Sequence, residues 1–108
     1  MNTEKQKKSI LEKATKASSE TVIVELINEI SKWLTTYPED IELWHARALL
    51  FEKQQKWAEA INDYMKIQGI DKDDQRARTR VEMLKTILRY KNTDIYSSPN
   101  THYDPWFE

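Results

Sequence analysis

Two histidines, at positions 45 and 102, are the side chains in this sequence best suited to proton transfer or metal binding. The acids nearest to His45 along the chain are Asp40 and Glu42, and none of the 108 residues is a cysteine. A metal site needs three or four convergent ligands, which these neighbours do not supply. We therefore expect His45 to be a solvated histidine on a surface groove, not a base, a metal ligand or a pH switch. His102 lies in a polar segment and is interpreted in the same way.

A basic run is the second group of side chains with possible chemistry. It comprises Arg76, Arg78, Arg80, Lys85 and Arg89. These cations fall on several faces of one predicted helix, and nearby acids dilute their charge. A solvated helix face is the simpler interpretation. Binding of RNA or a phosphorylated segment through Arg76, Arg80 and Lys53 remains an alternative, which a steep salt dependence would favour.

No set of nucleophile, base and orienting residue is recognisable in the sequence. The chain has a single glycine, Gly69, so a glycine-rich phosphate loop is absent, and no two histidines stand at metal-binding spacing. We assign no catalytic residue, no cofactor and no metal, and we do not expect an enzyme.

Composition is consistent with one soluble domain. The chain is 39% hydrophobic and 32% charged, with a formal net charge of −1. One glycine and three prolines are too few for an all-β fold. The longest aliphatic runs, residues 22–24 and 48–51, are too short to cross a bilayer, and residues 1–8 do not resemble a secretory signal. The absence of cysteine fits a reducing compartment, so we expect a cytoplasmic protein with neither membrane nor nucleic-acid partners.

Apolar residues recur at helical spacing along most of the chain. The first clear stripe contains Ile23, Leu26, Ile27, Ile30, Trp33 and Leu34. The second contains Leu43, Trp44, Ala48, Leu50 and Phe51, and the third Trp57, Ala60, Ile61, Tyr64 and Ile67. The fourth contains Ala77, Val81, Leu84 and Leu88, and residues 4–17 form a weaker helix around Ile10, Ala14 and Ala17.

Residues between the stripes predict where the helices begin and end. Ser18 or Ser19 can cap the helix that carries the first stripe, and Asp73 or Asp74 can cap the helix that carries the fourth. Pro38 follows the first stripe. Gly69 follows the third, where we expect a left-handed residue that ends the helix.

The large and small side chains repeat with an offset of 34 residues. Residues 7–40 overlay on 41–74 so that Ile10 falls on Trp44, Ala14 on Ala48, Ala17 on Phe51, Leu26 on Ala60, Ile30 on Tyr64, and Trp33 on Ile67. In the second unit, the small Ala48 and Ala60 allow two helices to approach closely while Tyr64 fills the adjacent gap.

This pattern resembles the tetratricopeptide repeat family, whose unit is a helix–turn–helix of that length. The match is good over residues 41–74 and moderate over 7–40, where Leu26 and Ala17 exchange the expected sizes. Gln55 stands where the family has a loop glycine, and Lys72 where it has a terminal proline. The chain is also similar to small single-motif members of this class that end in a Tyr/Asn/Asp-rich tail, here from residue 90 onward.

The resemblance implies an all-α, right-handed solenoid. We predict a domain over residues 1–91, made of helical hairpins at 7–40 and 41–74 and a capping helix at 74–91. In that last helix Arg78, Glu82 and Lys85 take the core positions of a further repeat, while Val81 and Leu84 still face back toward the preceding helix. A terminal helix needs only this inward face.

Members of the family bind peptides or helices in a concave groove lined by the first helix of each repeat. The resemblance carries the groove positions onto Lys8, Leu11 and Thr15 in the first unit. In the second unit they are His45, Leu49 and Glu52, with Lys53 beside them, and in the capping helix Arg76, Thr79 and Met83. Some members grip a terminal carboxylate, but His45 and Leu49 replace the residues that this needs, so we do not assign that activity.

Residues 92–108 form an irregular tail that is unusually aromatic. Its candidate anchors are Ile95, Tyr96, Tyr103, Trp106 and Phe107. Burying each aromatic contributes about 1.5–3 kcal/mol, against an ordering cost of about 1–2 kcal/mol per residue. We expect the part around Ile95 and Tyr96 to fold back on the helices. Occupation of the groove by residues 102–107, contact with a neighbouring protomer and an unstructured end all stay open.

Taken together, these features predict a scaffold that binds a protein or peptide partner in the groove. The alternative from another class is a structural module that self-associates, for example as a homodimer, through Trp106 and Phe107. The anionic-ligand hypothesis above is the third.

Overall fold

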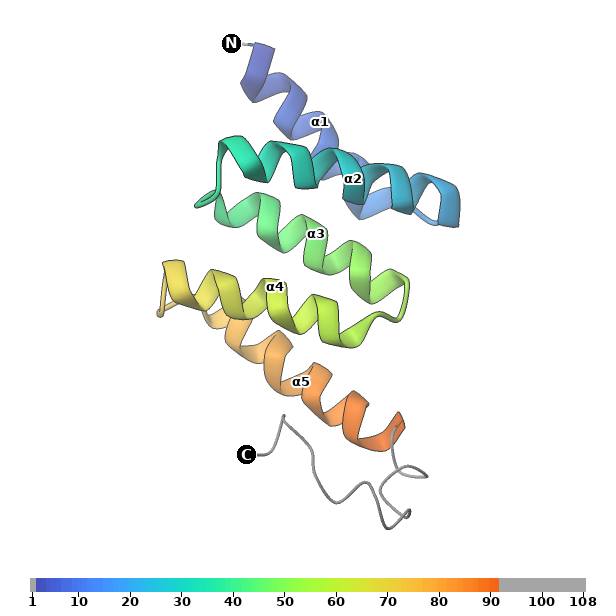
Figure 1. Ribbon diagram of the computed structural model, residues 1–108, viewed down its shortest axis with the longest axis vertical. Coiled ribbons are helices and arrows are strands. Elements are labelled where there is room, and N and C mark those ends of the chain that lie inside the picture. The colour runs from blue at the N-terminus through green and yellow to red at the C-terminus, as the bar shows by residue number, and fades with distance from the viewer. Residues whose placement is uncertain (1, 92–108) are drawn as a thin grey trace.

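The computed structural model describes residues 2–91, which form five α-helices and no strand. These are α1 (Asn2–Lys16), α2 (Glu20–Thr36), α3 (Ile41–Lys53), α4 (Trp57–Ile70) and α5 (Gln75–Lys91). The helices follow one another along the long axis of the molecule, with α1 and α5 at opposite ends (Figure 1). The all-α prediction is confirmed for this part of the chain, in which no helix is long and apolar enough to cross a membrane.

Short polar side chains begin three of these helices. Ser19 Oγ accepts a hydrogen bond from the Val22 amide at 3.3 Å, and Asp40 Oδ1 does the same for Leu43 at 3.3 Å. Asp74 Oδ1 accepts from the Ala77 amide at 2.8 Å. Each cap satisfies a donor that the first helical turn leaves without a partner. Ser19 and Asp74 are thus the caps, from the predicted pairs.

The two connections 37–40 and 71–74 have the same hydrogen bonds, offset by 34 residues. Tyr37 N donates to Trp33 O and Asp71 N to Ile67 O, both at 2.8 Å. Asp40 N donates to Tyr37 O and Asp74 N to Asp71 O, both at 3.2 Å. The sequence period therefore reappears in the backbone of these connections, and α3 and α5 begin 34 residues apart.

The predicted helix end at Gly69 and the turn at Gln55 have different backbone conformations. Gly69 was expected to end a helix in a left-handed conformation, which is wrong: it lies inside α4, and Asp71 caps that helix with extended backbone. A Cβ on Gly69 would meet nothing within 4 Å, so no close approach requires glycine there. Gln55, which takes the place of the family's loop glycine, adopts φ 61° between α3 and α4. The left-handed turn is therefore present without the residue that adopts it most easily.

The core consists of two apolar clusters that meet at α3. The first joins α1, α2 and α3 and includes Ile10, Ile30 and Leu50. The second joins α3, α4 and α5 and includes Ala48, Ala60, Ile61, Tyr64, Ile67, Ala77, Val81 and Leu84. Trp44 packs against both clusters. The predicted inward face of α5 is confirmed, since Val81 and Leu84 are buried.

Candidate functional site

A hollow of about 180 Å³ lies where α1, α3 and α5 meet. Its lining includes Leu11 and Thr15 from α1, His45 and Leu49 from α3, and Arg76 from α5. All five are groove positions predicted from the sequence, and they come from three helices that are far apart in the chain. Ala14, Glu42 and Ala46 complete the lining.

A second hollow, of about 370 Å³, adjoins the first beside the N-terminal half of α1. It shares Leu11 and Glu42 with the first hollow and adds Lys8, another predicted groove position. We refer to the two hollows, together with the face of α5 that carries Arg76, Thr79 and Met83, as the α1–α3–α5 groove.

His45 does not have the environment expected from the sequence. It is 7% exposed, and its Nε2 lies 3.2 Å from Asp74 Oδ2, so the prediction of a solvated histidine is wrong. Burial lowers the pKa of His45, and the nearby charge of Arg76 lowers it further, although the hydrogen bond to Asp74 acts in the opposite direction. Nδ1 is buried without a hydrogen-bond partner in residues 2–91. His45 is therefore a neutral side chain that links α3 to the start of α5.

Asp74 has two partners and acts as more than a cap. One carboxylate oxygen accepts from the Ala77 amide and the other faces His45. These hydrogen bonds lower the pKa of Asp74 in spite of the desolvation that opposes them. Asp40 at the start of α3 is held similarly, because Lys7 Nζ lies 2.7 Å from its Oδ2. In both cases the capping acid contacts a side chain of the helix before last: Asp74 at the start of α5 contacts His45 of α3, and Asp40 at the start of α3 contacts Lys7 of α1.

Glu52, Lys53 and Arg80 are engaged in contacts within the fold. Tyr64 Oη donates to Glu52 Oε2 at 2.6 Å, and the Arg80 guanidinium pairs with the same carboxylate. Burial and the Glu52 carboxylate raise the pKa of Tyr64, which keeps its hydroxyl a donor. Arg80, one of the three cations proposed for an anionic ligand, is thus already paired, and Lys53, a second, donates to backbone carbonyls.

Lys53 holds the end of α1. Its Nζ donates to the carbonyl oxygens of Ala14 and Thr15 at 2.8 Å each and of Ala17 at 2.7 Å. A cation at this position satisfies carbonyls that the last helical turn leaves free and complements the helix dipole. The sequence reasoning placed Lys53 in the groove and missed this role, because 36 residues separate it from Ala17.

The groove face of α5 remains available. Arg76 and Thr79 are exposed, and Met83 is 37% exposed with its sulfur 3.6 Å from an Arg80 nitrogen. Within residues 2–91 Arg76 makes no hydrogen bond or ion pair, whereas Glu42 at the same hollow is paired with Lys7 at 3.1 Å. The groove therefore combines apolar surface with a cation that makes no ion pair within residues 2–91, although its charge is near enough to Asp74 to lower the pKa of that carboxyl.

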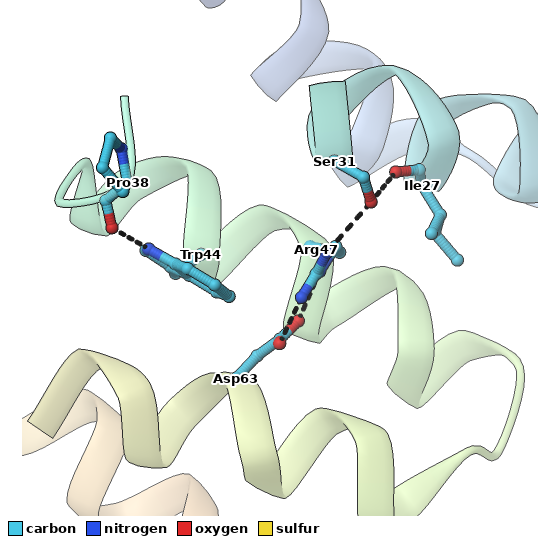
Figure 2. A network of polar contacts seen from close by, with 6 residues as sticks. All are labelled: Ile27, Ser31, Pro38, Trp44, Arg47 and Asp63. Atoms are coloured by element: carbon cyan, nitrogen blue, oxygen red, sulfur yellow. Dashed lines mark hydrogen bonds and ion pairs between the residues drawn. The ribbon is translucent and has the colours of Figure 1, made fainter. Parts of the chain in front are cut away.

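The opposite side of α3 carries a polar network that sequence reasoning missed. Arg47 donates to both oxygens of Asp63 on α4, at 2.9 and 2.8 Å, and to Ser31 Oγ on α2 at 2.9 Å (Figure 2). Its guanidinium carbon also lies 5.0 Å from the centre of the Trp44 ring. Burial raises the pKa of Asp63, although the charge of Arg47 opposes the shift. This network joins three helices.

A signal for that pair was present in the sequence. Positions 47 and 63 are each eight residues from Gln55, the turn residue between α3 and α4. Residues equidistant from the turn of a helical hairpin face one another, so opposite charges at such positions predict an ion pair. The apolar stripes do not reveal Arg47 and Asp63, because neither residue is apolar.

The predicted anchors of residues 92–108, namely Ile95, Tyr96, Tyr103, Trp106 and Phe107, lie outside the described residues, as does His102. Within the described part of the chain no group of three or more potential metal ligands comes together. No protein-family model, curated protein or solved structure matches this chain. Any function must therefore be inferred from the groove itself.

Proposed function

We propose that this protein is an interaction module that binds an extended segment or a helix of a partner polypeptide in the α1–α3–α5 groove. The observation that carries the proposal is the convergence of predicted groove residues from three helices on one hollow. There Leu11 and Leu49 supply apolar surface beside Arg76, a cation that makes no ion pair with the described residues. Few apolar anchors with polar groups around them are the usual composition of a peptide-binding site.

We further propose that the helices form a right-handed tetratricopeptide-like solenoid. The identical hydrogen bonds of connections 37–40 and 71–74 support a 34-residue structural unit. The packing of α3 against α1, α2 and α4 supports it as well, because each repeat of a solenoid contacts only its neighbours. In this arrangement α1, α3 and α5 are the first helices of successive units and line the concave side.

The volume of the hollow between α1, α3 and α5 limits the size of the side chain that it can hold. A cavity of about 150 Å³ accommodates a benzene ring, so the hollow of about 180 Å³ suits one aromatic or large aliphatic side chain. Arg76 at its edge would pair with a carboxylate of the partner. Thr79 offers a hydroxyl for a backbone group, and Thr15 Oγ1, which donates to the Leu11 carbonyl at 3.1 Å, can still accept from one.

Selection from a random peptide library displayed on phage, with the full chain as bait, tests the proposal. Peptides that bind should lose at least about tenfold in affinity to the variant Leu49→Asp/Met83→Asp, because a carboxylate replaces each apolar contact. The matched control is Val24→Asp/Met65→Asp, which alters side chains of similar exposure, 42% and 48%, on α2 and α4.

The proposal requires the control to change affinity less than about twofold, as expected for side chains outside the contact. Equal losses in both variants, or a selection that yields no binding peptide, would refute it. Binding that depends on concentration of the protein itself would instead favour the self-association alternative.

A further inference from the structure

We infer that the groove has an intramolecular occupant, residues 102–107 of the same chain, which any partner must displace. The inference rests on the groove of the proposed function and adds the chemistry of its ligand: an acidic segment with aromatic anchors. In this arrangement Asp104 pairs with Arg76, and Trp106 occupies the hollow beside Leu49.

Charge complementarity is the first reason. Residues 92–108 contain Asp94, Asp104 and Glu108 and no lysine or arginine, so all 17 basic residues of the chain lie before this segment. In the groove, Arg76 has no ion-pair partner within residues 2–91, while the acid at the same hollow, Glu42, is paired with Lys7. An opposite charge that reaches Arg76 gains a direct ion pair, which residues 2–91 do not provide, since Asp74 acts on Arg76 only at longer range.

Apolar complementarity is the second reason. Tyr103, Trp106 and Phe107 stand within five residues of one another, and the groove offers Leu11, Leu49 and Met83 as apolar surface. The hollow suits a single aromatic ring, as argued above. Pro105 disfavours helical backbone at Asp104, so an extended segment is expected, with Asp104 and Trp106 about 7 Å apart.

Chain length permits the contact. The 17 residues of α5 span about 25 Å, with Arg76 at their start. Trp106 follows the end of α5 by 15 residues, which reach at most about 50 Å when extended. The segment can therefore return along α5 to the hollow with about half of its reach unused. A tether of this length gives an effective concentration near the millimolar range, so a weak contact is sufficient.

Because the chain has no cysteine, a nitroxide can be placed on a single introduced one in the full-length protein. The probe is 5-fluorotryptophan, observed by fluorine NMR, with the Trp106 line assigned by Trp106→Phe. A nitroxide on Thr79→Cys, on the groove face of α5, should remove most of the Trp106 intensity. A nitroxide on Val24→Cys, on α2, should spare Trp106 and instead broaden Trp33, nine residues along the same helix.

Charge variants test whether Arg76 and Asp104 form the proposed ion pair. In the Thr79→Cys background, Arg76→Glu should restore the Trp106 intensity, and the exchange Arg76→Glu/Asp104→Lys should suppress it again. An undiminished Trp106 line with the nitroxide at position 79 overturns the inference. So does a loss of intensity that occurs only when spin-labelled chains are mixed with separately fluorinated ones, because the contact is then made by a second copy.

Failure of this inference and failure of the proposed function are distinguishable. If selected peptides bind the groove while Trp106 never approaches Thr79, the inference falls and the proposed function stands. If Trp106 contacts the groove and no peptide displaces it, the inference stands and binding of a foreign partner falls.

Discussion

Arg47 and His45 lie two residues apart on α3 and enter environments of opposite character. Arg47, on the side of α2 and α4, contacts a carboxylate, a hydroxyl and an aromatic ring, and its guanidinium nitrogens donate to Ser31 of α2 and Asp63 of α4. His45, on the side of α1 and α5, has one hydrogen-bond partner and a ring contact with Tyr64 at 5.6 Å, and its Nδ1 has no hydrogen-bond partner in the described residues. The first side is closed by its contacts, whereas the second opens into a hollow.

The difference separates a side closed by its own contacts from the side on which we propose that a partner binds. Buried polar groups normally have hydrogen-bond partners. On a side where the fold already supplies these partners, a ligand would add no missing hydrogen bond. The groove side keeps Leu49 partly exposed and Arg76 without an ion pair among residues 2–91, which is the composition expected of a surface that gains by binding. Substitutions on the two sides should therefore affect different measurements.

Arg47→Met should have the largest effect on stability. It leaves the Asp63 carboxylate, 5% exposed, buried without its cation, and breaking such a pair costs about 3 kcal/mol or more. Urea denaturation should show this loss, and the double variant Arg47→Met/Asp63→Leu should recover most of it, because the buried charge is then absent. A loss of less than about 1 kcal/mol for the single variant would show that the pair does not join the helices.

Acidification should weaken the fold through His45. Since its folded-state pKa lies below the unfolded value of 6.5, the unfolded chain binds more protons just below pH 6.5, and stability falls as the pH drops below that value. The slope of the unfolding free energy is at most about 1.4 kcal/mol per pH unit. Denaturation between pH 7.5 and 5 measures it, a range in which Asp74 stays ionised because its pKa is lowered.

His45→Gln should flatten that dependence. If this variant keeps the slope of the unaltered chain, His45 is not the group that links stability to pH.

Gly69→Ala changes neither side of α3 and should stabilise the protein. Gly69 is exposed inside α4, a Cβ there meets nothing within 4 Å, and alanine is favoured over glycine in a helix interior by about 0.5–1 kcal/mol. Thermal denaturation should show the gain without a change in peptide affinity. A destabilised variant would mean that the glycine has a packing role that its open surroundings do not indicate.

Arg76→Gln should have the smallest effect on stability and a clear effect on binding. The side chain is exposed and makes no hydrogen bond within residues 2–91, so the unfolding free energy should change by less than about 0.5 kcal/mol. Affinity for acidic peptides should fall several-fold, as measured by calorimetry. A large loss of stability with unchanged affinity would show that Arg76 stabilises the fold and does not bind the partner.

The sequence was informative wherever a property is local. Apolar spacing predicted the five helices, and the preference of serine and aspartate for helix starts narrowed the caps to pairs that contain Ser19 and Asp74. The resemblance to the tetratricopeptide family placed Leu11, Leu49 and Arg76 at groove positions, and all three line the hollow between α1, α3 and α5. These successes share a cause, which is that helix geometry fixes which residues share a face.

The errors arose from contacts between residues distant in the chain. The burial of His45 depends on Asp74, 29 residues away, and Lys53 reaches carbonyls of α1 that lie 36 to 39 residues earlier. Gly69 was misjudged for the opposite reason: nothing surrounds it, so the helix continues past it at a modest cost. Tertiary contacts decide such positions, and single residue types do not reveal them.

The central claim is that a ligand binds on the α1–α3–α5 side of α3. Chemical-shift mapping of the nitrogen-15-labelled full chain, titrated with the tightest peptide from the display selection, tests it directly. We predict that the largest shifts occur at the backbone amides of Leu11, Leu49, Arg76 and Met83. Shifts concentrated instead around Ser31, Arg47 and Asp63, or spread evenly over all five helices, would contradict it.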